Sequence, residues 1–201
     1  MPSSTPVTPT RVAVYTGTNL GSRGVYRAAA EELGRRLARR NVGLVYGGGH
    51  AGLMGVVADA VLAEGGEAIG VIPEFLADKE LAHTGLTELR VVPDMHTRKA
   101  VMADLSVGFV ALPGGFGTLE EITEMLTWTQ LALQAKPIVF LDVDGYWRAM
   151  FQLVHDMIDG GFVRPEHRSL VLRAEFPDEA VALATGPVPE VPNKWVDLEV
   201  R

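Results

Sequence analysis

The chain has 201 residues, of which 47% are hydrophobic and 21% charged, and its formal net charge is −7. This length and apolar content favour one globular domain with a sizeable core. The negative balance excludes a general nucleic-acid binder, because neutralising phosphates needs a basic surface. The chain has no cysteine, which excludes disulfides, thiolate nucleophiles and sulfur-ligated metals.

The N-terminal residues 1–10 are rich in Pro, Ser and Thr and lack the apolar core of a secretory signal. No apolar run reaches the roughly 18 residues that a membrane span needs. We therefore expect a cytoplasmic protein without a membrane partner, with a disordered tail over residues 1–10.

From residue 11 onward, short β-rich runs alternate with longer amphipathic segments. Six apolar runs predict strands at residues 11–17, 42–48, 67–73, 87–93, 106–115 and 136–142. Apolar residues at spacings of three and four predict helices at residues 25–40, 53–63, 94–105, 119–133 and 145–159. A weaker strand at 169–173 and a short helix at 178–184 complete the domain, and residues 185–201 are expected to form an extended tail.

Strands that are apolar throughout and separated by helices are typical of a parallel sheet covered on both faces. We therefore predict a single α/β domain over residues 11–184, with an open, doubly wound parallel sheet. In such sheets, ligands bind beyond the carboxyl ends of the strands. The turns that follow the strands should therefore carry the function.

Three of these turns, at residues 17–21, 47–52 and 113–118, are rich in glycine. Glycine lets the backbone approach a ligand closely, and the helix that follows presents unpaired N–H groups. Together they predict a site for a phosphate-bearing ligand, although each turn alone could simply be tight. The expected phosphate-binding residues are Gly48, Gly49, Gly114, Gly115, Gly117 and Thr118.

The middle turn also matches G-x-G-x-x-G, the pattern of dinucleotide-binding proteins. It follows the second strand rather than the first, and no acidic residue stands clearly at the tip of the next strand. An NAD-dependent enzyme is therefore only a minor alternative.

Glu120, Glu121 and Glu124 directly follow the third glycine-rich turn. Thr118 to Glu121 could form a capping box, in which Glu121 only returns a hydrogen bond to the helix start. Alternatively, an ionised carboxylate beside a phosphate site stabilises a sugar carbon that becomes cationic as a glycosidic bond breaks. The second interpretation predicts cleavage of a ribosyl phosphate.

A second cluster, residues 94–99, opens the helix before the PGG strand. Asp94 can cap this helix, and Arg98 with Lys99 can bind phosphate or carboxylate, unless they are a chance surface pair. We assign His96 to structure. None of the five histidines has the spacing of a metal-ligand pair, so no metal site is expected.

Four motifs together resemble the "lonely guy" (LOG) family of cytokinin-activating phosphoribohydrolases. They are YGGGHAGLMG (46–55), DMHTRKA (94–100), PGGFGTLEE (113–121) and TWTQLALQAKPIVFLDVDGYW (127–147). The likeness runs over residues 11–172. It implies a Rossmann-like homodimer that uses no cofactor and hydrolyses N6-substituted adenosine 5′-monophosphates, often AMP as well, to the free base and ribose 5-phosphate.

The resemblance also implies roles for individual residues. Arg98 and Glu121 correspond to the family's catalytic residues. Substrate contacts correspond to Glu80, Arg98, Lys99, Gly115, Phe116, Gly117, Thr118, Leu119, Glu120, Glu121 and Thr127. A non-catalytic carrier of a phosphorylated ligand, similar to molybdenum-cofactor carriers, is the main alternative. The older label of lysine decarboxylase fits poorly, because Lys99 is the only well-placed lysine and it adjoins Arg98.

Overall fold

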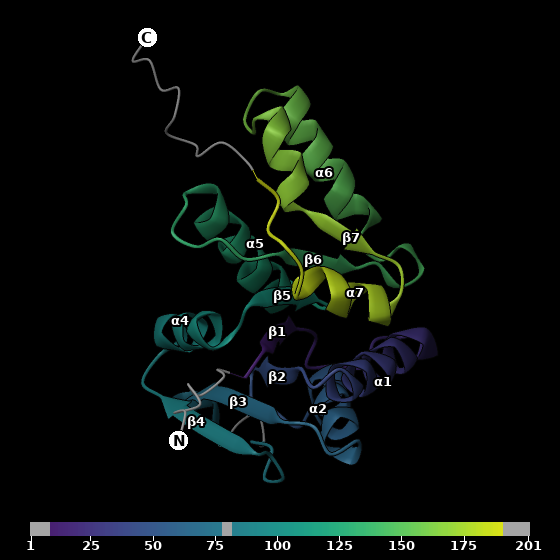
Figure 1. Cartoon of the computed structure of the whole chain (residues 1–201), viewed down its shortest axis with the longest axis vertical. Helices are drawn as coiled ribbons and strands as arrows, with labels where there is room; N and C mark the ends of the chain where they lie inside the picture. Colours follow the sequence, from purple (N-terminus) through teal and green to yellow (C-terminus); the bar gives the residue numbers. More distant parts are fainter. Residues whose placement is uncertain (1–8, 78–81, 191–201) are drawn as a thin grey trace, which may run out of the picture.

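A parallel sheet of seven strands forms the centre of the protein (Figure 1). The computed structural model describes residues 9–77 and 82–190. The strand order is β4-β3-β2-β1-β5-β6-β7, and every neighbouring pair is parallel. The strands are β1 (Arg11–Tyr15), β2 (Gly43–Tyr46), β3 (Ala68–Pro73), β4 (Glu88–Val92), β5 (Gly108–Ala111), β6 (Ile138–Leu141) and β7 (Leu172–Ala174).

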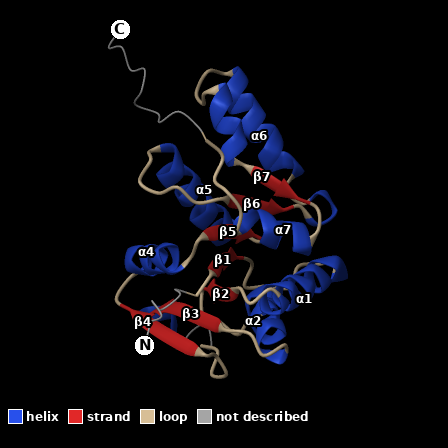
Figure 2. Ribbon diagram, viewed as in Figure 1, coloured by secondary structure: helices blue, strands red, loops and turns tan. Residues whose placement is uncertain are grey.

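Helices cover both faces of this sheet (Figure 2). They are α1 (Gly24–Arg39), α2 (Gly52–Ala63), α3 (Glu74–Ala77), α4 (Met95–Leu105), α5 (Phe116–Gln130), α6 (Arg148–Asp159) and α7 (Pro177–Ala184). Two short 3₁₀ segments, Val143–Gly145 and Pro165–Leu170, connect the later elements. Among the described residues, no helix is long and apolar enough to cross a membrane.

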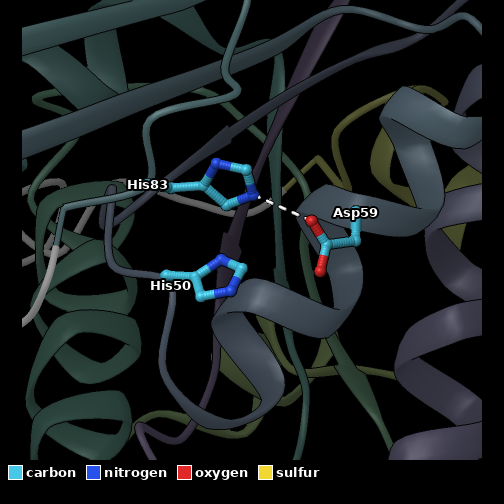
Figure 3. A group of neighbouring side chains, drawn as sticks. All are labelled: His50, Asp59 and His83. Carbon is cyan, nitrogen blue, oxygen red and sulfur yellow. Dashed lines mark hydrogen bonds and ion pairs between the residues drawn. The ribbon is translucent and has the colours of Figure 1, made fainter.

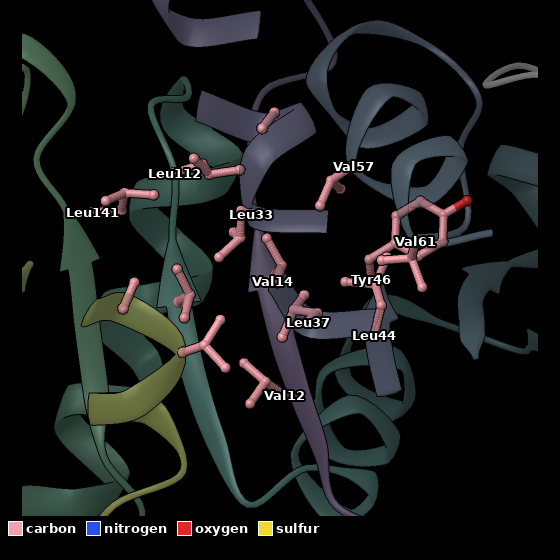
Figure 4. Packing of buried hydrophobic residues seen from close by; sticks show 14 of the residues in the cluster. Val12, Val14, Leu33, Leu37, Leu44, Tyr46, Val57, Val61, Leu112 and Leu141 are labelled. Carbon is pink, nitrogen blue, oxygen red and sulfur yellow. The ribbon is translucent and has the colours of Figure 1, made fainter. Parts of the chain in front are cut away.

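The core consists of two apolar clusters, one on each face of the sheet. Val12 and Val14 of β1 pack with α1, α2 and α7, as Figure 4 shows for Leu33, Leu37 and Val57. Ala13 and Tyr15 of the same strand belong to the opposite cluster, with α4 and α5. Successive residues of a strand point to opposite faces, so a strand buried on both sides is apolar throughout. The predicted doubly wound α/β fold is therefore confirmed.

Several element boundaries differ from the prediction. Helix α5 begins at Phe116, three residues earlier than predicted, because Gly115 is its extended N-cap residue. Thr118 therefore lies inside the helix and not at its N-cap, so the capping-box alternative for Glu121 is wrong. Helix α6 begins only at Arg148, because Asp144 and Gly145 have φ values of 55° and 75°, which break a right-handed helix. The last strand is displaced to Leu172–Ala174, and α3 and the 3₁₀ segments were not predicted.

The strand order places the three glycine-rich turns side by side. β1 lies between β2 and β5, so the chain winds from β1 toward β4 on one side and from β5 toward β7 on the other. The point between β1 and β5 is the topological switch point of the sheet, where such folds bind ligands. The turns after β1, β2 and β5 all open at this point. Of the predicted tails, residues 1–8 and 191–201 lie outside the described residues.

Candidate functional site

A cavity of about 270 Å³ lies at this switch point. Its walls come from the ends of β1 and β2, the start of α4 and the first turns of α5. The lining residues are Val14, Tyr15, Thr16, Gly17, Thr18, Gly47, Met54, Leu76, Met95, Arg98, Gly115, Phe116, Gly117, Thr118 and Glu121. The cavity therefore joins the two sequence clusters that were predicted separately, the one before α4 and the one after β5.

Arg98 and Glu121 face each other across this cavity. Arg98 Nη2 lies 3.6 Å from Glu121 Oε1, and the two residues are only 6% and 8% exposed. Arg98 Nη1 lies 3.7 Å from the sulfur of Met95, whereas Arg98 Nε is buried without a hydrogen-bond partner in the described structure. A buried donor without a partner costs free energy, so the guanidinium retains donor capacity for a bound anion.

Gly47, at the end of β2, makes room for the Arg98 guanidinium. A Cβ atom on Gly47 would lie 2.0 Å from Arg98 Nη2, which no real contact allows. A side chain at this position would therefore displace the Arg98 guanidinium, and no unusual φ is involved. This residue was not among the predicted phosphate-binding glycines, and only the packing of α4 against β2 reveals its role.

The N-terminus of α5 forms the opposite wall. Gly115 caps the helix, and its carbonyl accepts the first helical hydrogen bond, from Leu119 N at 3.1 Å. The N–H groups of Phe116, Gly117 and Thr118 therefore have no acceptor within the helix. Unpaired N–H groups and the positive end of the helix dipole favour an anion at this position.

Gly114 permits the close fit of this turn. A Cβ atom there would lie 2.1 Å from Thr118 Oγ1, so a side chain would displace the first turn of α5. The Gly114 carbonyl also accepts a hydrogen bond from the Tyr146 hydroxyl. Gly114 thus supports the wall without lining the cavity.

Lys99 points away from the cavity, toward the middle of α5. Its Nζ donates to Glu120 Oε1 and lies 2.8 Å from Glu124 Oε2. Burial lowers the pKa of the Lys99 ammonium, but the hydrogen bonds to these two carboxylates outweigh it and leave the pKa above its ordinary value. Lys99 therefore links α4 to α5.

Of the remaining predicted residues, those that the structure describes lie outside the cavity lining. Leu119, Glu120 and Thr127 are on the exposed side of α5, where Thr127 Oγ1 donates to the carbonyl of Thr123. Gly48 and Gly49 face β3 and the segment around Ala82 instead, through Gly48 O and a bridge to Ala82. Glu80 lies outside the described residues.

Sequence reasoning missed several lining residues, of which Tyr15 is the most informative. Burial, followed by the charge of Glu121, raises the pKa of its phenol well above the ordinary value, so the hydroxyl stays protonated. The position of Tyr15 at the carboxyl end of the first predicted strand was the available signal. Leu76 was hidden because α3 was not predicted.

The fold also brings together His50, Asp59 and His83, whose possible ligand atoms all lie within 4.8 Å of one another (Figure 3). Gly85 N donates to His83 Nδ1 at 3.0 Å, so that nitrogen carries no proton. The neutral ring then has its proton on Nε2, which donates to Asp59 Oδ1 at 2.9 Å. A metal would need the same Nε2 as a lone-pair donor. We therefore interpret this cluster as a structural Asp–His hydrogen bond.

A wider depression of about 790 Å³ lies beside α6, away from the glycine-rich turns. Its arginines, Arg148, Arg168 and Arg173, are exposed, and Arg173 pairs with Asp142 at 2.9 Å. It contains neither the buried Arg–Glu pair nor a glycine-rich wall. The smaller cavity is therefore the candidate active site.

This fold and site define a class: a doubly wound α/β protein with an anion-binding cavity at its switch point and a buried Arg–Glu pair. A family model described as "Possible lysine decarboxylase" matches residues 54–184. A "Probable cytokinin riboside 5′-monophosphate phosphoribohydrolase" of Oryza sativa subsp. japonica is 51% identical over 82% of this chain and 72% of its own length. A "Cytokinin riboside 5′-monophosphate phosphoribohydrolase" of Rhodococcoides fascians is 46% identical over 90% of this chain and 91% of its own length.

A third relative, a "Cytokinin riboside 5′-monophosphate phosphoribohydrolase" of Arabidopsis thaliana, is 44% identical over 85% of this chain and 80% of its own length. The chain therefore belongs to the LOG family of cytokinin riboside 5′-monophosphate phosphoribohydrolases. Among solved structures, a molybdenum-cofactor carrier protein from Chlamydomonas reinhardtii matches with a TM-score of 0.66 and 22% identity, over 86% of this chain and 93% of its own. At that identity, the likeness to the carrier shows the fold alone.

Proposed function

We propose that this protein hydrolyses the N-glycosidic bond of adenosine 5′-monophosphates, including those with an N6 substituent, and releases the free base and ribose 5-phosphate. The observation that carries the proposal is the buried pairing of Arg98 with Glu121 in a cavity at the N-terminus of α5. The relatives named as phosphoribohydrolases support the same reaction.

The 5′-phosphate binds at the N-terminus of α5. There it accepts hydrogen bonds from the N–H groups of Phe116, Gly117 and Thr118 and lies at the positive end of the helix. Arg98 supplies the compensating cation and a free Nε donor. Together these groups fix the ribose in the cavity, which converts binding free energy into orientation.

Glu121 then faces the anomeric carbon. As the bond to the purine breaks, this carbon acquires positive charge, and an ionised carboxylate stabilises that transition state more than the neutral substrate. A water molecule forms the new carbon–oxygen bond, and one of its protons ends on the departing base. Glu121 either stabilises the cation directly or orients this water, and Arg98 holds the phosphate and the Glu121 side chain.

The decarboxylase description of the family model receives no support from the two lysines that the structure describes, Lys99 and Lys136. A pyridoxal enzyme needs an amine that is free to form a Schiff base. Lys99 is paired with two carboxylates, and Lys136 donates to the carbonyl of Ala103 at 2.6 Å, away from the cavity. Lys79 and Lys194, the other two lysines of the chain, lie outside the described residues.

A homodimer is part of the same proposal. Phe116 at the rim of the cavity is 93% exposed, and Leu119 on α5 and Leu133 just beyond its C-terminal end leave further apolar surface. Apolar side chains gathered at one helix face favour burial against a second surface. A partner on this face would also cover Leu119, Glu120 and Thr127, the predicted substrate contacts outside the cavity.

The predicted cytoplasmic location is tested by fractionation of the host cell.

The purified protein should release ribose 5-phosphate and free base from AMP or from N6-isopentenyladenosine 5′-monophosphate, measured by liquid chromatography and mass spectrometry. The absence of release from both substrates contradicts the proposal. A pterin that co-purifies with the protein in native mass spectrometry would favour the carrier alternative instead. A change in nicotinamide fluorescence on titration would favour an NAD enzyme.

A further inference from the structure

Helices α4 and α5 are joined by two ionic contacts that stand next to each other. Arg98 pairs with Glu121 on the side of the cavity, at 3.6 Å. The next residue of α4, Lys99, pairs with Glu120 and Glu124 on the side away from the cavity. The consecutive residues Arg98 and Lys99 of α4 thus contact the consecutive residues Glu121 and Glu120 of α5. The Lys99 contact keeps Arg98 and Glu121 aligned.

The Lys99 contact is buried at its cationic end. Lys99 is 4% exposed, whereas Glu120 is more than half exposed and Glu124 is about one quarter exposed. A buried ammonium needs paired carboxylates, and removing either side leaves the other charge uncompensated. The pairing is therefore coupled to the packing of α4 on α5.

The pairing of Lys99 with Glu120 and Glu124 also affects the electrostatic environment of Glu121. Glu120 and Glu124 lie on the same helix as Glu121, and two cations face these three carboxylates from α4. Among the described residues, Tyr15 of β1 is a further titratable group close to these carboxylates, and its phenol is neutral. Lys99 thus offsets part of the negative charge of Glu120 and Glu124, whose field favours protonation of Glu121.

We propose that Lys99 is a positioning residue, which holds α5 in register with α4 and favours the ionised form of Glu121 by offsetting part of the negative charge of Glu120 and Glu124. This role rests on the proposed hydrolysis for its consequence in catalysis. It replaces the clamp expected from the sequence, in which Lys99 binds the substrate phosphate. To reach a phosphate in the cavity, Lys99 would have to leave both carboxylates.

The proposal predicts how the titration of Glu121 responds to substitution. In Lys99→Met, the apolar stem remains but the cation is lost, so Glu120 and Glu124 repel the ionised form of Glu121. The pKa of Glu121 should rise by about one pH unit, the size expected for loss of a nearby opposite charge. Because only the ionised form is active, the acidic limb of the profile of kcat/KM should move to higher pH by the same amount.

The decisive experiment is a carboxyl ¹³C NMR titration of the ligand-free protein, with the Glu121 resonance assigned by its loss in Glu121→Gln. We expect the higher midpoint in Lys99→Met and a midpoint near that of the wild type in Lys99→Arg. The triple variant Lys99→Met with Glu120→Gln and Glu124→Gln should bring the midpoint back to the wild-type value or below it, because the cluster then carries no negative charge.

Lys136→Met is the matched control, since Lys136 is also a partly buried lysine that contacts α4, through the carbonyl of Ala103. It should leave the Glu121 midpoint unchanged. Equal midpoints in Lys99→Met and the wild type would overturn the proposal, as would a higher KM for nucleotide with an unchanged pH profile, the signature of a phosphate clamp. A wild-type protein without hydrolase activity would overturn the proposed function, while the NMR titration would still test Lys99.

Discussion

At the scale of single residues, the site depends on the absence of a side chain at Gly47. Gly47 has no Cβ, and the Arg98 guanidinium occupies the space where one would be. Neither a turn pattern nor the φ of Gly47 reveals this requirement. It arises because the end of β2 and the first turn of α4 meet only in the folded protein.

Gly47→Ala should therefore displace Arg98 and misplace the phosphate. We expect kcat/KM to fall by about 10²-fold, the usual cost of a misplacement of about 1 Å. Initial rates of base release measure it. Gly24→Ala is the control, because a Cβ at Gly24 meets nothing within 4 Å. Full activity of Gly47→Ala would show that Arg98 is not held as described.

The Tyr15 hydroxyl provides a second prediction at this scale. It is buried without a hydrogen-bond partner in the described structure, while its ring stacks on Phe109 with centroids 6.1 Å apart. Tyr15→Phe keeps the ring and removes the unpaired group. The free energy of unfolding should stay the same or rise by about 1 kcal/mol. Denaturant unfolding measures it, and Tyr46→Phe on the opposite face of the sheet should behave in the same way, because its hydroxyl is also buried without a partner in the described structure; a clear loss of stability in either variant would contradict the prediction.

At the scale of elements, the start of α4 positions Arg98. Asp94 is the N-cap residue: Thr97 N donates to its Oδ1 at 2.8 Å, and Thr97 Oγ1 donates to its Oδ2 at 3.0 Å. These hydrogen bonds hold the pKa of Asp94 below its ordinary value, and the one from the backbone of Thr97 has the largest effect. The cap was predicted from the sequence, and the structure confirms it.

A lowered pKa in the folded state means that the stabilisation by Asp94 is complete at neutral pH and is lost as the pH falls through the folded-state value. Asp94→Ala should therefore lower Tm at pH 7, and the difference from the wild type should shrink below about pH 4, the ordinary range for aspartate. Asp94→Asn keeps the cap acceptor and should lose much less. A difference in Tm that stays constant from pH 7 to pH 3 would contradict this account.

The elements also show what the sequence could and could not predict. Strands β1, β2, β3, β5 and β6 are buried, and they were predictable because continuous apolar runs between amphipathic segments leave few alternatives. The mostly exposed edge strand β4 was also predicted, from a less continuous apolar run. The short α3 and the 3₁₀ segments were not predicted, and β7 was predicted with displaced bounds, because segments of three to six residues carry no clear period. The convergence of the glycine-rich turns followed from parallel pairing. The pairing of Lys99 with Glu120 and Glu124 did not, because it depends on how α4 packs against α5.

At the scale of the whole molecule, the exposed face of α5 predicts self-association. Thr123 lies between Leu119 and Thr127 on this helix and does not line the cavity. Thr123→Arg should introduce a charge into the interface and shift a dimer toward monomer, measured by light scattering after size-exclusion chromatography. Gln152→Arg, on the exposed side of α6, should leave the mass unchanged. A wild-type monomer across the concentration range would contradict the dimer.

The central claim about the whole molecule is that the cavity at the switch point breaks a glycosidic bond with Glu121 as its negative charge. The most direct test compares the wild type with Glu121→Gln, which keeps the shape and removes the charge, using N6-isopentenyladenosine 5′-monophosphate. Base and ribose 5-phosphate should form with the wild type in equal amounts, and kcat should fall by about 10²- to 10³-fold in the variant, with KM little changed. A Glu121→Gln variant that releases base at the wild-type rate would contradict the account.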